Sequence, residues 1–214
     1  MKCSTSKGMK TTLKQLYVTQ TKQKNFPYGN QSSALRRLWT IFKTANLGRF
    51  NRSPFFPAPA NVNAMSTVWQ VLSPIVANPS CLPSSQNAFD AWHQQVVVDL
   101  AHAYHPQAPF PLGVAQKTLN LVLKDLWAWN MLTEPQEDNL HAPIDRIIYQ
   151  KYLNPPARWQ SWSLVQWTNE SELTALWQDY QILQTGMRQR AQLLTSSNLV
   201  IQPLMLEQLL WGGI

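Results

Sequence analysis

The sequence is poor in cysteine, in glycine and in long apolar runs, and each scarcity excludes classes of protein. Its 214 residues include only two cysteines, Cys3 and Cys81, too few for a disulfide framework or a four-cysteine zinc site. The seven glycines form neither the Gly-x-x-x-x-Gly-Lys loop of nucleotide-binding enzymes nor the Gly-x-Ser-x-Gly turn of serine hydrolases. No apolar run approaches the roughly 18 residues of a membrane span, and no apolar stretch of a secretory signal follows the basic N-terminus. We therefore expect no cofactor, no membrane contact and a cytoplasmic, reducing location.

Acidic residues are absent until Asp90. Residues 1–89 carry eleven lysines and arginines, whereas residues 90–214 carry seven basic and eleven acidic side chains, for a net charge of +7. A segment of one sign repels itself unless a polyanion or another partner meets it. Nucleic acid is the commonest such polyanion, so the pattern favours DNA binding, with a solvated basic tail as the alternative.

The four histidines give little support for a metal site. His102 and His105 are three residues apart, and Asp99 is the only carboxylate close to them in the sequence. A zinc site needs three or four such ligands. We therefore interpret this pair as surface or helix-end histidines and predict no metal.

The hydrophobic pattern predicts an all-α protein with long, proline-rich connections. Residues 1–33 are polar with weak periodicity, and we expect a basic, loosely ordered arm there. Residues 34–214 are predicted to form a single all-α domain, with two lobes around a cleft as an alternative arrangement. Apolar residues recurring at three- and four-residue steps, together with proline and glycine breaks, predict the helices. They are expected at 33–47, 63–72, 86–104, from about 112 to 129, and at 146–153, 158–167, 171–195 and 203–211.

Two lysines share one face of the helix that follows Pro111. Lys117 and Lys124 are seven residues apart, and Leu119, Val122 and other apolar residues occupy the opposite face. A cation near a helix start is disfavoured by the helix dipole, and a second lysine on the same face disfavours it further. Both effects favour the neutral amine that a nucleophilic lysine requires. The alternative is an ordinary lysine that contacts phosphate or solvent.

An aspartate follows at the start of a later predicted helix. Asp145 comes two residues after Pro143 and would be stabilised there by the unpaired N–H groups of the helix start. A lone aspartate of this kind is usually just a helix cap. The combination of a Gly-Lys turn, a helix, a loop and a Pro-x-Asp helix start is what favours a chemical role.

This combination, over about 45 residues within 106–153, resembles the helix-hairpin-helix DNA glycosylases. Pro111-Leu112-Gly113-Val114-Ala115-Gln116-Lys117-Thr118 is similar to their hairpin, and His141-Ala142-Pro143-Ile144-Asp145 is similar to the segment of their catalytic aspartate. The Gln-Lys-Thr run and the second lysine are most similar to the archaeal 8-oxoguanine glycosylase branch. Ala115 stands where the family usually has the second hairpin glycine.

The resemblance implies a helical glycosylase architecture and roles for individual residues. Lys117 would attack C1′ of the sugar and form a Schiff base, and Asp145 would stabilise the developing oxocarbenium charge and activate the nucleophile. If Lys117 were only structural, water activated by Asp145 would replace it. The implied and charge-based DNA contacts are Gly113, Ala115, Lys124, Arg36, Arg37, Arg49 and Arg52. Trp127, Trp129 and His141, together with Trp159 and Trp162, are candidates for the base pocket.

The sequence therefore predicts a DNA glycosylase that hydrolyses the bond to a damaged or modified base flipped out of DNA. Such an enzyme would serve repair or defence against phages with modified DNA. Two alternatives remain open: a non-catalytic helical nucleic-acid-binding protein, and a protein-interaction subunit that uses its ten tryptophans and proline-rich loops.

Overall fold

The computed structural model describes residues 6–45, 65–104, 111–144, 148–149, 167–196 and 199–212. Within these ranges the chain is helical, and the only β-type pairing is an isolated bridge between Ser196 and Leu199. The all-α prediction is confirmed. The longer helices are α1 (Ser6–Gln20), α2 (Gln31–Ala45), α3 (Ser66–Ala77), α4 (Gln86–Tyr104), α5 (Leu112–Ala128), α6 (Glu134–Asn139), α9 (Glu170–Leu194) and α10 (Pro203–Gly212).

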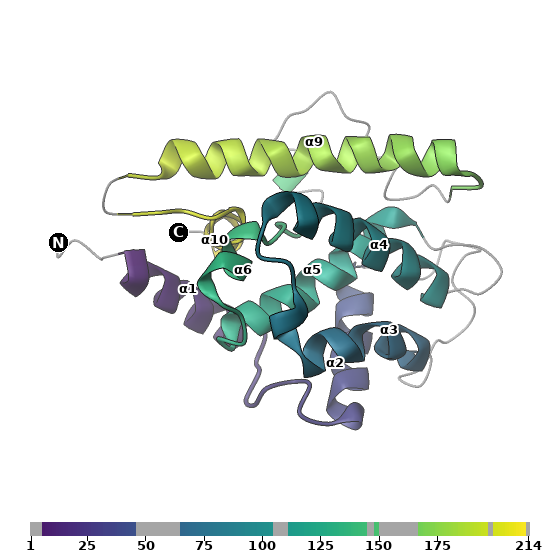
Figure 1. Cartoon of the computed structure of the whole chain (residues 1–214). Coiled ribbons are helices and arrows are strands. Elements are labelled where there is room, and N and C mark those ends of the chain that lie inside the picture. Colours follow the sequence, from purple (N-terminus) through teal and green to yellow (C-terminus); the bar gives the residue numbers. More distant parts are fainter. Residues whose placement is uncertain are drawn as a thin grey trace.

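Helix α5 is the centre of the described structure. It contacts α1, α2 and α4, while the long α9 lies along one side of the bundle and contacts α10 (Figure 1). Apolar residues such as Leu119 and Leu126 are fully buried on α5. Of the residues of this helix, only Lys117 and Leu121 are not buried. The buried side chains of the described helices form one continuous core.

The predicted loosely ordered arm is wrong for residues 6–33. Residues Ser6–Gln20 form α1, which packs against α5 and α10. Leu13 and Tyr17 of this helix are buried in the core, at 1% and 4% exposure. Met9, Leu13 and Tyr17 of α1 lie at four-residue spacing, with Leu16 and Val18 beside Tyr17, but the first half of the helix is otherwise polar, which is why the periodicity appeared weak.

Two further boundaries differ from the prediction. Residues 134–139, expected to be a loop, form α6, which the Thr-x-x-Gln pattern of a helix start accounts for. The side chain of Gln136 accepts a hydrogen bond from the Thr133 N–H at 3.0 Å. Helix α3 continues through Pro74, where the sequence predicted a break. The predicted limits of α4, α9 and α10 agree with the structure to within one residue.

Candidate active site

A cavity of about 580 Å³ lies beside the exposed edge of α5. Its walls come from α1 and the turn after it, from α2, α5 and α10, and from the segment that follows α6. The lining residues are Tyr17, Gln20, Thr21, Lys22, Arg37, Thr40, Ile41, Thr44, Lys117, Leu121, Lys124, Pro143, Glu207, Gln208 and Trp211. Residues 111–144 and 203–212, far apart in the sequence, therefore share one site.

Both predicted lysines line this cavity. Lys117 is half-buried, whereas Lys124 is buried and forms an ion pair with Glu207 of α10. The Lys124 Nζ atom also lies 4.8 Å from the centre of the Tyr17 ring. Lys124, predicted to contact DNA, is thus held by a carboxylate inside the protein.

Pro143 places the predicted aspartate segment beside the same cavity. Asp145 itself lies outside the described residues, as do Arg49, Arg52, Trp159 and Trp162. The distance between the Lys117 amine and the Asp145 carboxylate is therefore not described, and their pairing stays a prediction.

Arg37 reaches the cavity from α2 but is held by Asp125, a fully buried carboxylate of α5. Its Nε and Nη2 atoms donate to the two Asp125 oxygens, each at 2.8 Å. The hydroxyl groups of Tyr17 and Tyr28 donate to the same carboxylate at 2.9 and 2.7 Å. Burial and the Asp125 charge raise the pKa of both tyrosines, so these phenols stay neutral. This network fixes α1 and α2 against α5 and so shapes one wall of the cavity.

The other predicted site residues lie elsewhere. Gly113 and Ala115 are buried in the first turn of α5, and Arg36 is exposed on α2. Trp127 is fully buried, and the Trp129 indole N–H donates to the Gln23 side chain at 2.7 Å. Neither tryptophan, nor His141, is among the described residues that line the cavity.

The structure adds three residues of α10 that the sequence prediction missed. Glu207 and Gln208 are buried against the cavity, and Trp211 lies beside them with 51% of its surface exposed. Their sequence, Glu-x-x-x-Trp, carries no chemical motif. The one feature in the sequence that could have indicated them is Glu207, a single charged residue in an otherwise largely apolar predicted helix.

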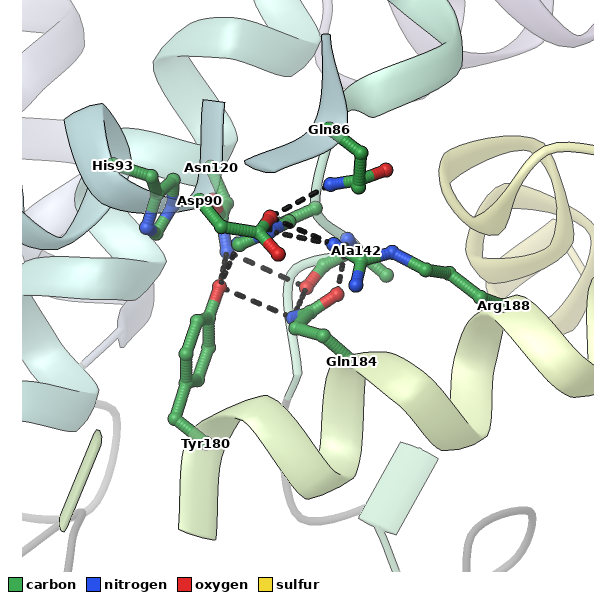
Figure 2. Close-up of polar contacts among 9 residues, drawn as sticks. Gln86, Asp90, His93, Asn120, Ala142, Tyr180, Gln184 and Arg188 are labelled. Atoms are coloured by element: carbon green, nitrogen blue, oxygen red, sulfur yellow. Dashed lines mark hydrogen bonds and ion pairs between the residues drawn. The ribbon is translucent and has the colours of Figure 1, made fainter. Parts of the chain in front are cut away.

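A second polar cluster, in the interior, holds the segment that contains Pro143 (Figure 2). His141 Nε2 is 2.7 Å from an Asp90 oxygen, and His141 Nδ1 is 2.8 Å from the Tyr180 hydroxyl. Asp90 also accepts a hydrogen bond from Arg188 at 2.9 Å. A neutral His141 with its proton on Nε2 donates to Asp90 and accepts from the Tyr180 hydroxyl, and Arg188 donates to the same Asp90 oxygen.

Two adjacent imidazoles, tilted 47° to each other, form the centre of this cluster. The rings of His93 and His141 are 4.3 Å apart, and both side chains are buried. Burial lowers the pKa of each, and for His93 the charge that His141 would carry lowers it further. Burial alone would raise the pKa of Asp90, but its partners His141 and Arg188 lower it to about 2. At neutral pH the histidines are therefore uncharged and Asp90 is ionised.

The described residues contain no group of three or more histidines, cysteines or acids that could hold a metal ion. No helix in the described ranges is both long and apolar enough to cross a membrane. Comparisons with models of known families, with curated proteins and with solved structures found no match to this chain. The resemblance to helix-hairpin-helix glycosylases therefore depends on the motif residues alone and stays a prediction.

Proposed function

We propose that the chain is a DNA glycosylase and that the cavity beside α5 receives the extruded nucleotide. One observation carries this proposal: Lys117 and Pro143, two residues before Asp145, line the same cavity. The two halves of the motif are 26 residues apart, counted from position 117 to position 143. An ordinary solvated lysine would have no particular reason to share a cavity with Pro143.

The charge and size of the cavity support the same function. Four lysines and arginines line it; Lys124 and Arg37 are paired with Glu207 and Asp125, whereas Lys22 is exposed at its edge. Cations near an extruded nucleotide attract its flanking phosphates. The volume of about 580 Å³ lies within the range of pockets that enclose a small organic molecule. Trp211 offers an aromatic face on which an unstacked base can lie.

The proposed reaction uses the amine and the carboxylate together. The neutral Lys117 amine attacks C1′, the C1′–N bond breaks, and its electron pair leaves with the base, which takes up a proton. The C1′–O4′ bond then breaks, O4′ keeps its electron pair and takes up a proton from water, and a Schiff base forms. Water hydrolyses this Schiff base to an abasic site and the free amine. Asp145 stabilises the positive charge on the sugar and accepts the proton released by the amine.

The first test is base release from a panel of duplexes that carry oxidised, alkylated, deaminated or hypermodified bases. Released bases are identified by mass spectrometry and abasic sites are counted. We expect Asp145→Asn to lower base release by at least about 10³-fold and to leave DNA binding within about twofold. Asp99→Asn, at an exposed aspartate of α4, is the matched control.

Borohydride trapping tests the amine separately. We expect a covalent protein–DNA adduct in the wild type and in Lys24→Ala, an exposed-lysine control, but not in Lys117→Ala. An active Asp145→Asn enzyme would refute the mechanism. Salt-dependent DNA binding without any released base would instead favour a non-catalytic binding protein, and no DNA binding would favour a protein-interaction subunit.

A further inference from the structure

The segment from Leu140 to Ile144 is buried but belongs to no helix. A buried backbone must find hydrogen-bond partners somewhere, because an unpaired N–H or C=O group in the interior is costly. Ala142 has no backbone partner among the described residues. Its partners are side chains that come from α5 and α9.

The side-chain amide of Gln184 in α9 forms hydrogen bonds with both the N–H and the C=O group of Ala142. Its Oε1 atom accepts from the Ala142 N–H at 3.0 Å, and its Nε2 atom donates to the Ala142 carbonyl oxygen at 2.8 Å. Gln184 is only 1% exposed, so water does not compete for these bonds. Figure 2 shows the two dashed lines that join its amide to Ala142. This paired contact fixes both the position and the orientation of the peptide.

The Gln184 side chain, which clamps Ala142, is itself held by neighbouring polar groups. The Gln184 Nε2 atom lies within hydrogen-bonding distance of the Tyr180 hydroxyl, at 3.1 Å, and the side-chain amide of Asn120 reaches the same hydroxyl at 3.1 Å. Asn120 lies on α5, between Lys117 and Lys124. The side chain that fixes Ala142 is therefore connected by hydrogen bonds to the helix that carries the lysines.

We infer that Gln184 is a positioning residue, which sets the cavity wall at Pro143 relative to Lys117. This inference depends on the proposed function. Ala142 directly precedes Pro143 and is three residues from Asp145. A displacement of about 1 Å at a reacting group can cost about 10²-fold in rate, so an amide clamp next to the site has a large effect without touching substrate.

The test compares two substitutions at this position. Gln184→Met removes both hydrogen bonds at similar volume, and Gln184→Glu keeps the acceptor for the Ala142 N–H but loses the donor to its carbonyl. Gln181→Met, on the exposed face of α9, is the matched control. Three quantities are measured for each folded protein: amide hydrogen exchange at residues 141–144, affinity for a duplex with an abasic analogue, and base release at saturating DNA.

We expect Gln184→Met to exchange the Ala142 amide at least tenfold faster, and Gln184→Glu, which keeps the acceptor for that N–H, to do so by a smaller factor, while amides in α5 stay protected. Base release should fall by 10- to 100-fold, and affinity for the abasic duplex should stay within about twofold. Unchanged exchange would overturn the clamp, and faster exchange with unchanged base release would overturn its positioning role. If Gln184→Met does not fold, Gln184→Glu decides. A wild-type protein that releases no base from any duplex would refute the proposed function itself, and with it this inference.

Discussion

Trp211 lies half-exposed beside the cavity on α10, whereas Trp127, only a few residues beyond Lys124, is fully buried. The two side chains are chemically identical, so their surroundings decide what each can do. A buried indole packs the core. An indole at the edge of a cavity has a free face for stacking.

Replacement of Trp211 tests this reading under the proposed function. Base–aromatic stacking contributes about 1–3 kcal/mol per base, so we expect Trp211→Ala to weaken binding of a substrate duplex by about 10- to 100-fold. Trp211→Phe should retain most of the affinity. Affinity for a duplex with an abasic analogue should not change, because no base is present to stack. Equal losses on both duplexes, measured by fluorescence anisotropy, would assign Trp211 to phosphate contacts or to folding.

At the scale of the element, α1 is part of the domain. Leu13 and Tyr17 enter the core, and Lys10 and Lys14 both pair with Glu137 of α6, at 2.9 and 2.6 Å. The Tyr17 hydroxyl also meets Asp125 in α5. The helix thus contributes packing, ion pairs and one wall of the candidate site.

Truncation of α1 should therefore unfold the protein rather than merely weaken DNA binding. We expect a chain that begins at Lys22 to lose cooperative thermal unfolding by circular dichroism. Leu13→Ala in the full chain should lower the free energy of unfolding by about 2–5 kcal/mol, because it leaves a cavity in the core. Thr11→Ala, at an exposed position of the same helix, should have little effect. A truncated chain with wild-type melting would restore the arm hypothesis.

The sequence predicted helices where a wide apolar face repeats. The limits of α4, α9 and α10 follow from such faces. It missed α1, whose first half is mostly polar, and α6, whose six residues are too short for periodicity to show. The hydrophobic pattern of the sequence predicts a helix only when the apolar face is wide. Helices with a weaker pattern are stabilised by their tertiary contacts.

The candidate site was predictable only in part, for a similar reason. Lys117, Lys124 and Pro143 belong to a motif that is continuous in the sequence. Glu207 lines the cavity and Gln184 holds Ala142 beside it, and both residues lie more than 60 positions after Lys117. No local signal indicates which buried polar residues will meet. Their role appears only when the helices are packed together.

At the scale of the whole molecule, the one-sided charge of the first 89 residues is partly compensated within the fold. Lys10 and Lys14 meet Glu137, and Arg37 meets Asp125. All the acidic residues lie at or after Asp90, so folding brings basic side chains of residues 1–89 into contact with carboxylates of the later part of the chain. Lys7, Lys22, Lys24, Arg36 and Lys43 remain exposed. Among the described residues of the basic segment, these side chains are the exposed cations.

Stability should depend on pH through the two buried histidines. Burial holds the pKa of His93 and His141 below the ordinary value. Below that ordinary value, the two imidazoles therefore bind more protons in the unfolded chain than in the folded protein. Stability is therefore full above about pH 6.5 and falls as the pH drops below it. Each such proton contributes a slope of up to about 1.4 kcal/mol per pH unit. Asp90, whose pKa is lowered to about 2, adds a further loss below about pH 4.

Guanidinium unfolding at pH 8, 7, 6 and 5 measures this slope. We expect His93→Gln to reduce the slope between pH 7 and pH 5, because one of the two buried imidazoles no longer takes up a proton on unfolding. The glutamine amide can still donate to the side-chain oxygen of Asn120, Oδ1, which His93 Nε2 contacts at 2.7 Å. This bond limits the loss of stability at pH 8. His102→Gln, at an exposed position of the same helix, should leave the slope unchanged. If the wild type is equally stable at pH 8 and pH 5, or if His93→Gln and His102→Gln behave alike, the buried imidazole pair does not control the acid response of this fold.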